Sequence, residues 1–144
     1  MINDIFNNYK NYLENLNIIG LNNLDDYVSQ DIEFRDPFHS TIGIEEMRNV
    51  FLRLFSFLNE IEFLVLDSSI TENIIFYEWS LTGVRNKKKW KIEGITKLQI
   101  NNDGLVIKHF EHWDSATQFY EQFPVLGMLL RNIRKLIRKK EIKL

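Results

Sequence analysis

The sequence contains no cysteine and only two prolines among its 144 residues. Without cysteine the chain can form no disulfide, no thiolate metal site and no thiol nucleophile. No apolar run approaches the roughly 18 residues of a membrane span. The amino-terminal residues 1–4 also lack the basic start of a secretory signal. We therefore expect no membrane span and no signal peptide, and we predict a cytoplasmic protein.

Several signatures of specific chemistry are missing as well. There is no glycine-rich phosphate loop, no serine nucleophile elbow and no dinucleotide-binding fingerprint. The three histidines, His39, His109 and His112, have no short ligand spacing on one element, so we expect no metal site. The basic carboxyl-terminal residues have no aromatic residue after Phe123, so we expect no nucleic acid partner.

The composition favours one folded domain. Hydrophobic residues make up 44% of the chain and aromatic residues 13%, which supplies apolar surface for one core. The net charge of −2 is uneven, because residues 125–144 carry seven basic residues and one acidic residue. The rest of the chain has 11 basic and 19 acidic residues, a net charge of −8. We therefore predict a main domain over residues 1–124 and a basic helix over residues 125–144.

Hydrophobic periodicity divides the main domain into helices followed by strands. Apolar residues at helical spacing place helices at residues 3–16, 21–28 and 44–58. From residue 61 the period becomes two, which is typical of strands. The predicted strands cover residues 32–35, 61–68, 73–83, 88–101 and 104–114. Three helices and a run of long strands predict an α+β fold with the helices against one face of the sheet.

Two short motifs identify a wider relationship. Residues 34–38 read Phe-Arg-Asp-Pro-Phe, and Tyr12 lies 24 positions upstream of the aspartate, Asp36. Residues 111–114 read Glu-His-Trp-Asp at the end of the last predicted strand. Together these features resemble the nuclear transport factor 2-like superfamily, which includes ketosteroid isomerases and SnoaL-like polyketide cyclases. The resemblance covers nearly the whole chain.

This resemblance implies a cone-shaped domain, in which a curved antiparallel sheet wraps over three N-terminal helices around an apolar cavity. It implies a homodimer formed through the outer face of the sheet. It also implies chemistry without a cofactor on a hydrophobic cyclic small molecule, such as isomerisation, cyclisation or dehydration. The superfamily also contains proteins without catalytic activity, so a small-molecule-binding or scaffold protein is the alternative.

Asp36 is the first candidate catalytic residue. It follows a strand and is flanked by apolar residues, which favours a partly desolvated carboxylate suited to proton transfer. The resemblance places it on the general base of ketosteroid isomerases, where a similar Asp-Pro pair occurs. The alternative is a structural role, in which Asp36 caps the loop before the long helix or pairs with Arg35 or Arg48.

Tyr12 is the second candidate. Its spacing from Asp36 equals that between the oxyanion-hole tyrosine and the base in ketosteroid isomerases, so it would donate a hydrogen bond in the cavity. The alternative is an ordinary core tyrosine with a satisfied hydroxyl. Thr96 occupies the strand position of the third catalytic group, a protonated aspartate. Threonine cannot replace a strong acidic donor, which argues against true steroid isomerase activity.

The last predicted strand supplies a further set of candidates. Strand alternation turns His109, Glu111 and Trp113 toward the cavity, where a histidine and a carboxylate on one face can share a proton. A one-residue bulge would instead turn Phe110 and His112 inward. In a third alternative Glu111 forms a structural ion pair and Trp113 is core. The side chains expected to hold the ligand are Phe34, Phe55, Trp90, Thr96 and Trp113.

The carboxyl-terminal segment predicts an amphipathic helix. From Pro124 onward, large aliphatic residues fall on one face and basic residues on the other. Docking of this helix on the domain is the favoured interpretation, since Phe119 and Phe123 upstream resemble anchors. Packing in a dimer and contact with an anionic membrane surface are the less favoured alternatives.

Overall fold

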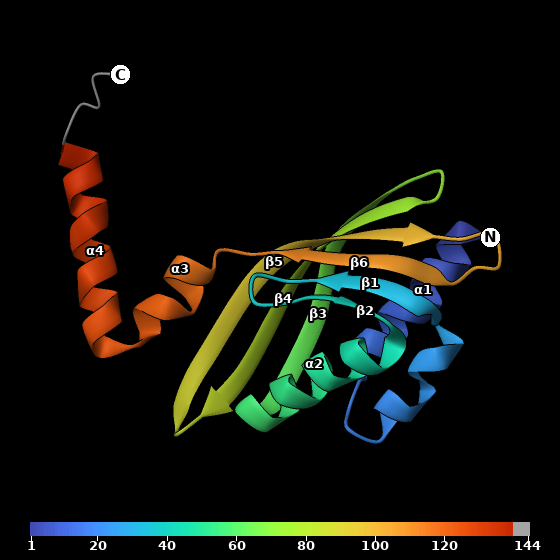
Figure 1. The fold of residues 1–144 in the computed structure, drawn as a ribbon, viewed down its shortest axis with the longest axis horizontal. Helices are drawn as coiled ribbons and strands as arrows, with labels where there is room; N and C mark the ends of the chain where they lie inside the picture. Colours follow the sequence, from blue (N-terminus) through green and yellow to red (C-terminus); the bar gives the residue numbers. More distant parts are fainter. Residues whose placement is uncertain (140–144) are drawn as a thin grey trace. The chain divides into compact units, whose positions relative to one another are not determined.

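The computed structural model describes residues 1–139 (Figure 1). The chain divides into two units, of which the first runs from Met1 to Trp113 and the second begins at Asp114. The first unit contains the sheet and the N-terminal helices, and the regular elements described in the second, up to Lys139, are helices. Lys140 and Lys143 of the predicted basic segment lie outside the described residues.

Helix α1 (Ile2–Glu14) and the 3-10 helix η1 (Gly20–Asp26) form the N-terminal part of the first unit. The side chains that α1 buries recur at three- and four-residue spacings, as the sequence predicts for an amphipathic helix; they are Phe6, Tyr9 and Leu13. The predicted helix over residues 21–28 ends earlier, because strand β1 begins at Val28.

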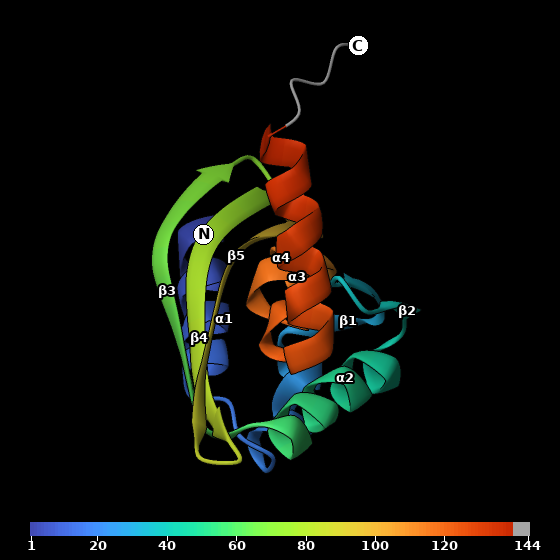
Figure 2. The same ribbon diagram turned by 90° about the vertical axis from the view of Figure 1, so that its left-hand side faces the viewer.

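Helix α2 (Ile44–Phe57) confirms the helix predicted over residues 44–58. Gly43 before it has a φ of 104°, a conformation that favours glycine. Glu45 and Glu46 lie in its first turn, where negative charge suits the helix dipole. Both α1 and α2 lie on the inner side of the curved sheet (Figure 2).

The sheet has six strands in the order β2-β1-β6-β5-β4-β3. The strands are β1 (Val28–Arg35), β2 (Ser40–Ile42), β3 (Asn59–Thr71), β4 (Ile74–Arg85), β5 (Lys88–Ile100) and β6 (Val106–His112). All neighbours pair antiparallel except β1 and β6, which are parallel. The fold is therefore the predicted α+β cone, but its sheet is mixed, whereas the sequence predicts an antiparallel one.

The turns that join β4 to β5 and β5 to β6 contain residues with positive φ. Asn86 and Lys87 both have positive φ, 49° and 64°, as a two-residue hairpin turn requires. At the next turn the side-chain oxygen of Asn101 accepts a bond from the backbone N–H of Asp103 at 3.0 Å. Gly104 completes this turn with a φ of 82°. These turns fix the register of β4, β5 and β6.

Curvature of the sheet has identifiable causes. Register shifts occur in the β1–β6, β3–β4 and β5–β6 pairs, and such bulges bend and twist a sheet. Gly94 on β5 lets Trp79 of β4 approach the backbone. A Cβ on Gly94 would lie 2.7 Å from both Trp79 Cζ2 and the carbonyl oxygen of His112. This close approach explains why the aromatic-rich inner face needs glycine here.

The second unit is built from α3 (Ser115–Gln118), the 3-10 helix η2 (Tyr120–Gln122) and α4 (Pro124–Lys139). Asp114 caps α3, because its carboxylate accepts hydrogen bonds from the backbone N–H and the hydroxyl of Thr117. These bonds hold the pKa of Asp114 below its ordinary value. The amphipathic helix predicted from Pro124 onward is present as α4.

Candidate active site

A buried histidine lies at the centre of the candidate site. His109 on β6 is 1% exposed, and its Nδ1 lies 2.9 Å from the hydroxyl oxygen of Tyr9 on α1. Its Nε2 lies 2.9 Å from Oε1 of Glu111. A neutral imidazole has one donor and one acceptor nitrogen, and a carboxylate only accepts, so in this form Nε2–H donates to Glu111 and Nδ1 accepts from the Tyr9 hydroxyl. Three side chains thus form a hydrogen-bond chain from α1 to the end of β6.

Aromatic rings enclose the imidazole of His109. The ring centres of Phe34, Tyr9 and Phe51 lie 5.3, 5.9 and 6.4 Å from that of His109. All three aromatic side chains are buried. The enclosure keeps water away from the imidazole, which strengthens its hydrogen bonds to Tyr9 and Glu111.

Two phenols of this interior stay protonated at neutral pH. Burial raises the pKa of Tyr9 well above 10, and the nearby Tyr77 and Glu111 raise it further. Burial also raises the pKa of Tyr77, with Glu111 adding to the effect and a hydrogen bond to Thr96 opposing it. The hydroxyl of Thr96 accepts a 2.9 Å bond from Trp79 Nε1. Tyr9 is therefore a neutral hydrogen-bond donor, as an oxyanion hole requires.

Glu111 is the partly exposed end of the chain. Its side chain is 19% exposed, whereas His109 is almost fully buried. The strand register places Glu111 opposite Thr96, and Thr96 opposite Tyr77, in one row across three strands. His109 is buried and Glu111 contacts its imidazole, whereas His112, the next residue along the strand, is exposed.

Asp36 lies at the same end of the sheet. The parallel register pairs Phe34 with His109 and Arg35 with Phe110, so Asp36 and Glu111 each follow the last paired residue of adjacent strands. Beyond them the rings of Phe38 and Trp113 meet edge to face at 5.3 Å. Parallel pairing therefore places two acidic residues that are far apart in the sequence at the same end of adjacent strands.

Asp36 is held by its own turn. Its Oδ1 accepts hydrogen bonds from the backbone N–H of Phe38 at 2.7 Å and of His39 at 2.6 Å, and His39 Nδ1 lies 2.9 Å away. Arg35 instead lies over the ring of Phe110, and Arg48 pairs with Asp25. The geometry thus shows the local capping that the sequence allows for Asp36. Its role as a base stays a prediction.

Tyr12 does not join this group. Its hydroxyl donates to the carbonyl oxygen of Gly20 at 3.0 Å, and its ring stacks on Tyr27 at 4.2 Å. Partial burial raises the pKa of Tyr12 to about 12. Tyr9, one helical turn earlier, is the α1 tyrosine whose hydroxyl contacts His109.

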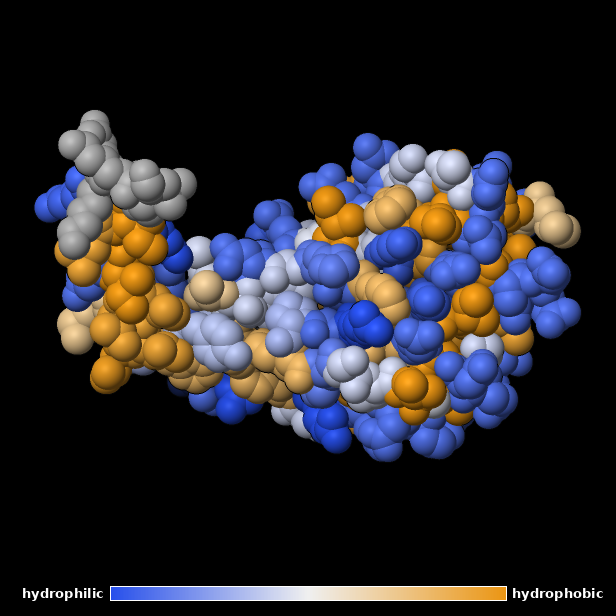
Figure 3. All heavy atoms as spheres, turned by 45° about the horizontal axis from the view of Figure 1, so that its top comes forward, coloured by the Kyte–Doolittle hydropathy of each residue, from blue (hydrophilic) through white to orange (hydrophobic). Residues whose placement is uncertain are grey.

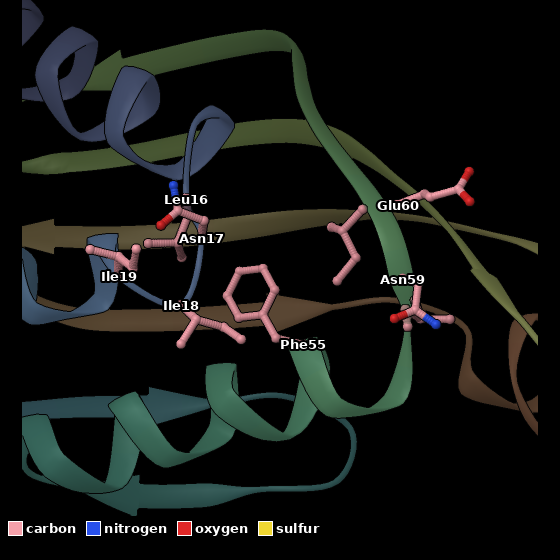
Figure 4. Close-up of a pocket in the computed structure, with 9 residues that line it drawn as sticks. Leu16, Asn17, Ile18, Ile19, Phe55, Asn59 and Glu60 are labelled. Carbon is pink, nitrogen blue, oxygen red and sulfur yellow. The ribbon is translucent and has the colours of Figure 1, made fainter.

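An open pocket of about 460 Å³ lies at the C-terminal end of α2. It is lined by Leu16, Asn17, Ile18, Ile19, Phe55, Leu58, Asn59, Glu60 and Ile61. Figure 4 shows the Phe55 ring pointing into the space between residues 16–19 and the start of β3. The lining is mostly apolar, which suits a hydrophobic ligand.

Phe51 lies between the pocket and the histidine. On α2, Phe51 contacts the His109 ring, and Phe55, one turn later, lines the pocket. On α1, Tyr9 contacts His109, and Leu16, seven residues later, lines the pocket. Helix α1 ends at Glu14, five residues or about 7.5 Å after Tyr9, and Leu16 follows in the loop. The hydrogen-bond chain and the pocket are therefore separate regions of the first unit.

The predicted ligand-binding residues divide between core and pocket. Of these side chains, only Phe55 lines the described pocket. Phe34, Trp90 and Thr96 are buried in the core, where Trp90 packs edge to face on Phe57 at 5.4 Å. Trp113 packs on Phe38. The sequence interpretation missed Tyr9, although it lies in the middle of the apolar stripe of α1, which is the signal that identifies it as buried.

No group of three histidine, aspartate or glutamate side chains that could hold a metal ion occurs within residues 1–139. The two histidine–carboxylate pairs, His109 with Glu111 and His39 with Asp36, each contain one carboxylate. The chemistry that this arrangement offers is proton transfer and hydrogen-bond donation.

Comparisons with known proteins agree with the fold. Residues 9–109 match the family model of the SnoaL-like domain. No protein of curated function matches the sequence. Among solved structures, the chain is similar to an NTF2-like protein of unknown function from Exiguobacterium sp. 255-15, with a TM-score of 0.66 and 16% identity. That alignment covers 76% of this chain and 98% of the other.

Two further structures show the same similarity. TsrD from Streptomyces laurentii aligns with a TM-score of 0.65 and 16% identity over 88% of this chain and 94% of its own. A protein from Jannaschia sp. CCS1, described as a SnoaL-like polyketide cyclase, aligns with a TM-score of 0.59 and 15% identity over 66% and 72%. At these identities the similarity shows the fold alone.

Proposed function

Because the chain belongs to the SnoaL-like domain family, we propose that it is an acid–base enzyme that isomerises or cyclises a hydrophobic cyclic ketone without a cofactor. The observation that carries the proposal is the hydrogen-bond chain of Tyr9, His109 and Glu111. It combines a neutral donor, an imidazole and a carboxylate within one apolar interior. These are the groups that proton abstraction next to a carbonyl requires.

The proposed first step removes a proton from the substrate carbon. The hydroxyl of Tyr9 turns from His109 to the substrate carbonyl oxygen, which frees the Nδ1 lone pair. Nδ1 then takes the proton from the adjacent carbon, and the C–H electrons move into the carbonyl group to form an enolate. Tyr9 stabilises the enolate oxygen, and Glu111 stabilises the imidazolium through Nε2–H, as a carboxylate does in other histidine-based sites.

The second step decides the reaction class. If His109 returns the proton to a different carbon of the conjugated enolate, the product is an isomer with a moved double bond. If the enolate carbon attacks a second carbonyl group, a ring closes and the imidazolium protonates the new alkoxide. In either case no proton or electron is lost, so the residues present supply every proton transfer.

The substrate's apolar part is proposed to occupy the pocket at Phe55. Phe51 separates this pocket from His109, so the reacting carbon reaches the imidazole only when the Phe51 ring turns aside. Asp36, whose oxygens already accept hydrogen bonds within its own turn, is the second candidate base.

A second candidate function is ligand binding without catalysis. The observation that favours it is the filled interior around His109, which contrasts with the open pocket at Phe55. In this case an apolar molecule would bind at Phe55 and never contact the imidazole.

Deuterium exchange distinguishes the two functions. Cyclic ketones such as tetralones and cyclohexenones are incubated with the protein in heavy water, and deuterium at the carbon next to the carbonyl is followed by NMR. The enzyme hypothesis expects catalysed exchange that His109→Gln removes and that the exposed control His112→Gln, on the same strand, preserves. Binding of a ketone without exchange would support the storage function instead.

We further propose that the protein is a cytoplasmic homodimer. The outer face of the sheet exposes large apolar side chains, which suits contact with a second copy. They are Leu64, Leu66, Phe76 and Ile95. Light scattering of the full chain, compared with the Phe76→Glu variant, tests this arrangement.

A further inference from the structure

Helix α4 has two chemically opposite faces. At 100° per residue, its large aliphatic side chains from Val125 to Ile137 fall within about 140° of the helix circumference, apart from Met128. The opposite side carries Arg131, Arg134, Lys135, Arg138 and Lys139. No acidic residue occurs between Pro124 and Lys139. The hydrophobic side is visible along α4 in Figure 3.

The second unit packs on the polar side of α4. Gly127 is buried there, and a Cβ at this position would overlap the carbonyl oxygen of Glu121. Arg131 donates to the same oxygen, and Arg134 pairs with the Glu121 carboxylate. Gly127, Arg131 and Arg134 all lie away from the aliphatic side. Contacts within the unit therefore use the polar side.

The aliphatic side is left uncovered by its own unit. Four of its large side chains, which span more than two helical turns, are between 44% and 60% exposed. They are Leu129, Ile133, Leu136 and Ile137. A continuous apolar surface of this kind is a binding surface when it is bordered by polar residues.

We propose that α4 lies flat on an anionic lipid bilayer. Its aliphatic side would enter the interface between head groups and acyl chains, and its basic residues would contact lipid phosphates. The helix has 16 residues, a length of about 24 Å, which is shorter than the hydrocarbon core of about 30 Å. Within residues 1–139 no helix is long and apolar enough to cross a membrane. The helix therefore binds along the surface.

Charge favours the bilayer over a second copy of α4. Pairing two such helices through their aliphatic sides would cover the apolar surface, but the ten basic residues would stay on the outer sides with no acidic partner from either helix. An anionic bilayer supplies the missing opposite charge and the apolar surface at once.

Vesicle co-sedimentation of the full chain tests the proposal. One set of vesicles is pure phosphatidylcholine, and the other contains phosphatidylglycerol as the anionic lipid. We expect binding to the anionic vesicles, at least tenfold weaker binding to the neutral ones, and loss of binding at high salt. The double variant Leu129→Glu/Ile133→Glu should lose binding, whereas the exposed control Ile42→Glu on β2 should retain it.

Thermal melting and light scattering of the same variants complete the test. The proposal expects that Leu129→Glu/Ile133→Glu leaves the melting temperature and the mass unchanged. A lower melting temperature would show that α4 docks on the main domain, and a lower mass would show that it joins two copies. Either result, or failure of the natural sequence to bind anionic vesicles, would overturn the membrane proposal. None of these measurements depends on ketone chemistry.

Discussion

The hydroxyl of Tyr9 and the imidazole of His109 meet at 2.9 Å although a hundred residues separate them in the sequence. One comes from the first helix and the other from the last strand of the sheet. Neither side chain has more than 1% of its surface exposed. Loss of this buried hydrogen bond lowers stability, because the partner that remains is buried and cannot form a replacement hydrogen bond with water.

Replacing Tyr9 with Phe should therefore affect both stability and activity. The loss of one buried hydrogen bond should lower the free energy of unfolding by about 1–3 kcal/mol. Loss of the oxyanion donor should lower exchange of ketone protons by roughly a hundredfold or more. Urea unfolding and the exchange rate measure the two effects. Tyr12→Phe is the matched control, and an equal loss of activity there would restore the role that the sequence assigns to Tyr12.

Asp36→Asn distinguishes the two candidate bases. The amide oxygen can still accept the backbone N–H bonds of Phe38 and His39, so stability should change little. If His109 is the base, ketone exchange should remain within a few-fold of the natural rate. A loss of about a hundredfold, the usual scale for a missing general base, would instead assign the proton transfer to Asp36.

Phe55→Ala tests the pocket. A flat apolar ligand such as naphthol should bind with micromolar affinity, and loss of the aromatic contact should weaken it about tenfold. Leu52→Ala, at an exposed position on the same helix, should leave the affinity unchanged. Titration calorimetry gives both values. Equal affinities for the two variants would mean that the ligand binds elsewhere.

The tight approach at Gly94 makes a sharp stability prediction. Gly94→Ala should lower the free energy of unfolding by about 1–3 kcal/mol, because the new methyl group overlaps Trp79 and the backbone at His112. At Gly20 an added Cβ would find its nearest atom at 3.6 Å, so Gly20→Ala should be close to neutral. Chemical denaturation of both variants checks the difference.

Alkaline pH should unfold the protein through its buried phenols. The folded pKa of Tyr12 is about 12, and the pKa values of Tyr9 and Tyr77 are also raised, whereas tyrosine in the unfolded chain titrates near 10. The unfolded state therefore loses protons first, and stability should fall progressively above about pH 10. Melting curves from pH 8 to 12 measure this. Tyr77→Phe, with one phenol fewer, should have a shallower slope.

The sequence predicts the sheet interior well because strand alternation is a local property. Trp90, Ile92 and Thr96 on β5 are buried as their spacing predicts, and His109 and Glu111 face inward. The sequence could not reveal the parallel pairing of β1 with β6, because neither segment carries a local signal for a partner as distant as His109 is from Phe34. That pairing is what places Asp36 beside the end of β6.

The choice between Tyr9 and Tyr12 was also beyond the sequence. Both lie in the apolar stripe of α1, and the spacing from Asp36 favours Tyr12, whereas Tyr9 is the one that contacts His109. The actual position depends on how residues 15–27 return the chain to β1, and here that segment includes a 3-10 helix whose Gly20 carbonyl binds Tyr12. Which residue of a helix meets a given partner depends on tertiary packing and not on the local sequence.

The adjacency of β1 and β6 also governs when the domain can fold. Until residues 106–112 have been synthesised, β1 has only the three-residue strand β2 as a neighbour, and one edge of it stays unpaired. Closing so long a loop late favours slow folding. During synthesis on the ribosome, β1 therefore cannot complete its pairing until nearly the whole first unit has emerged.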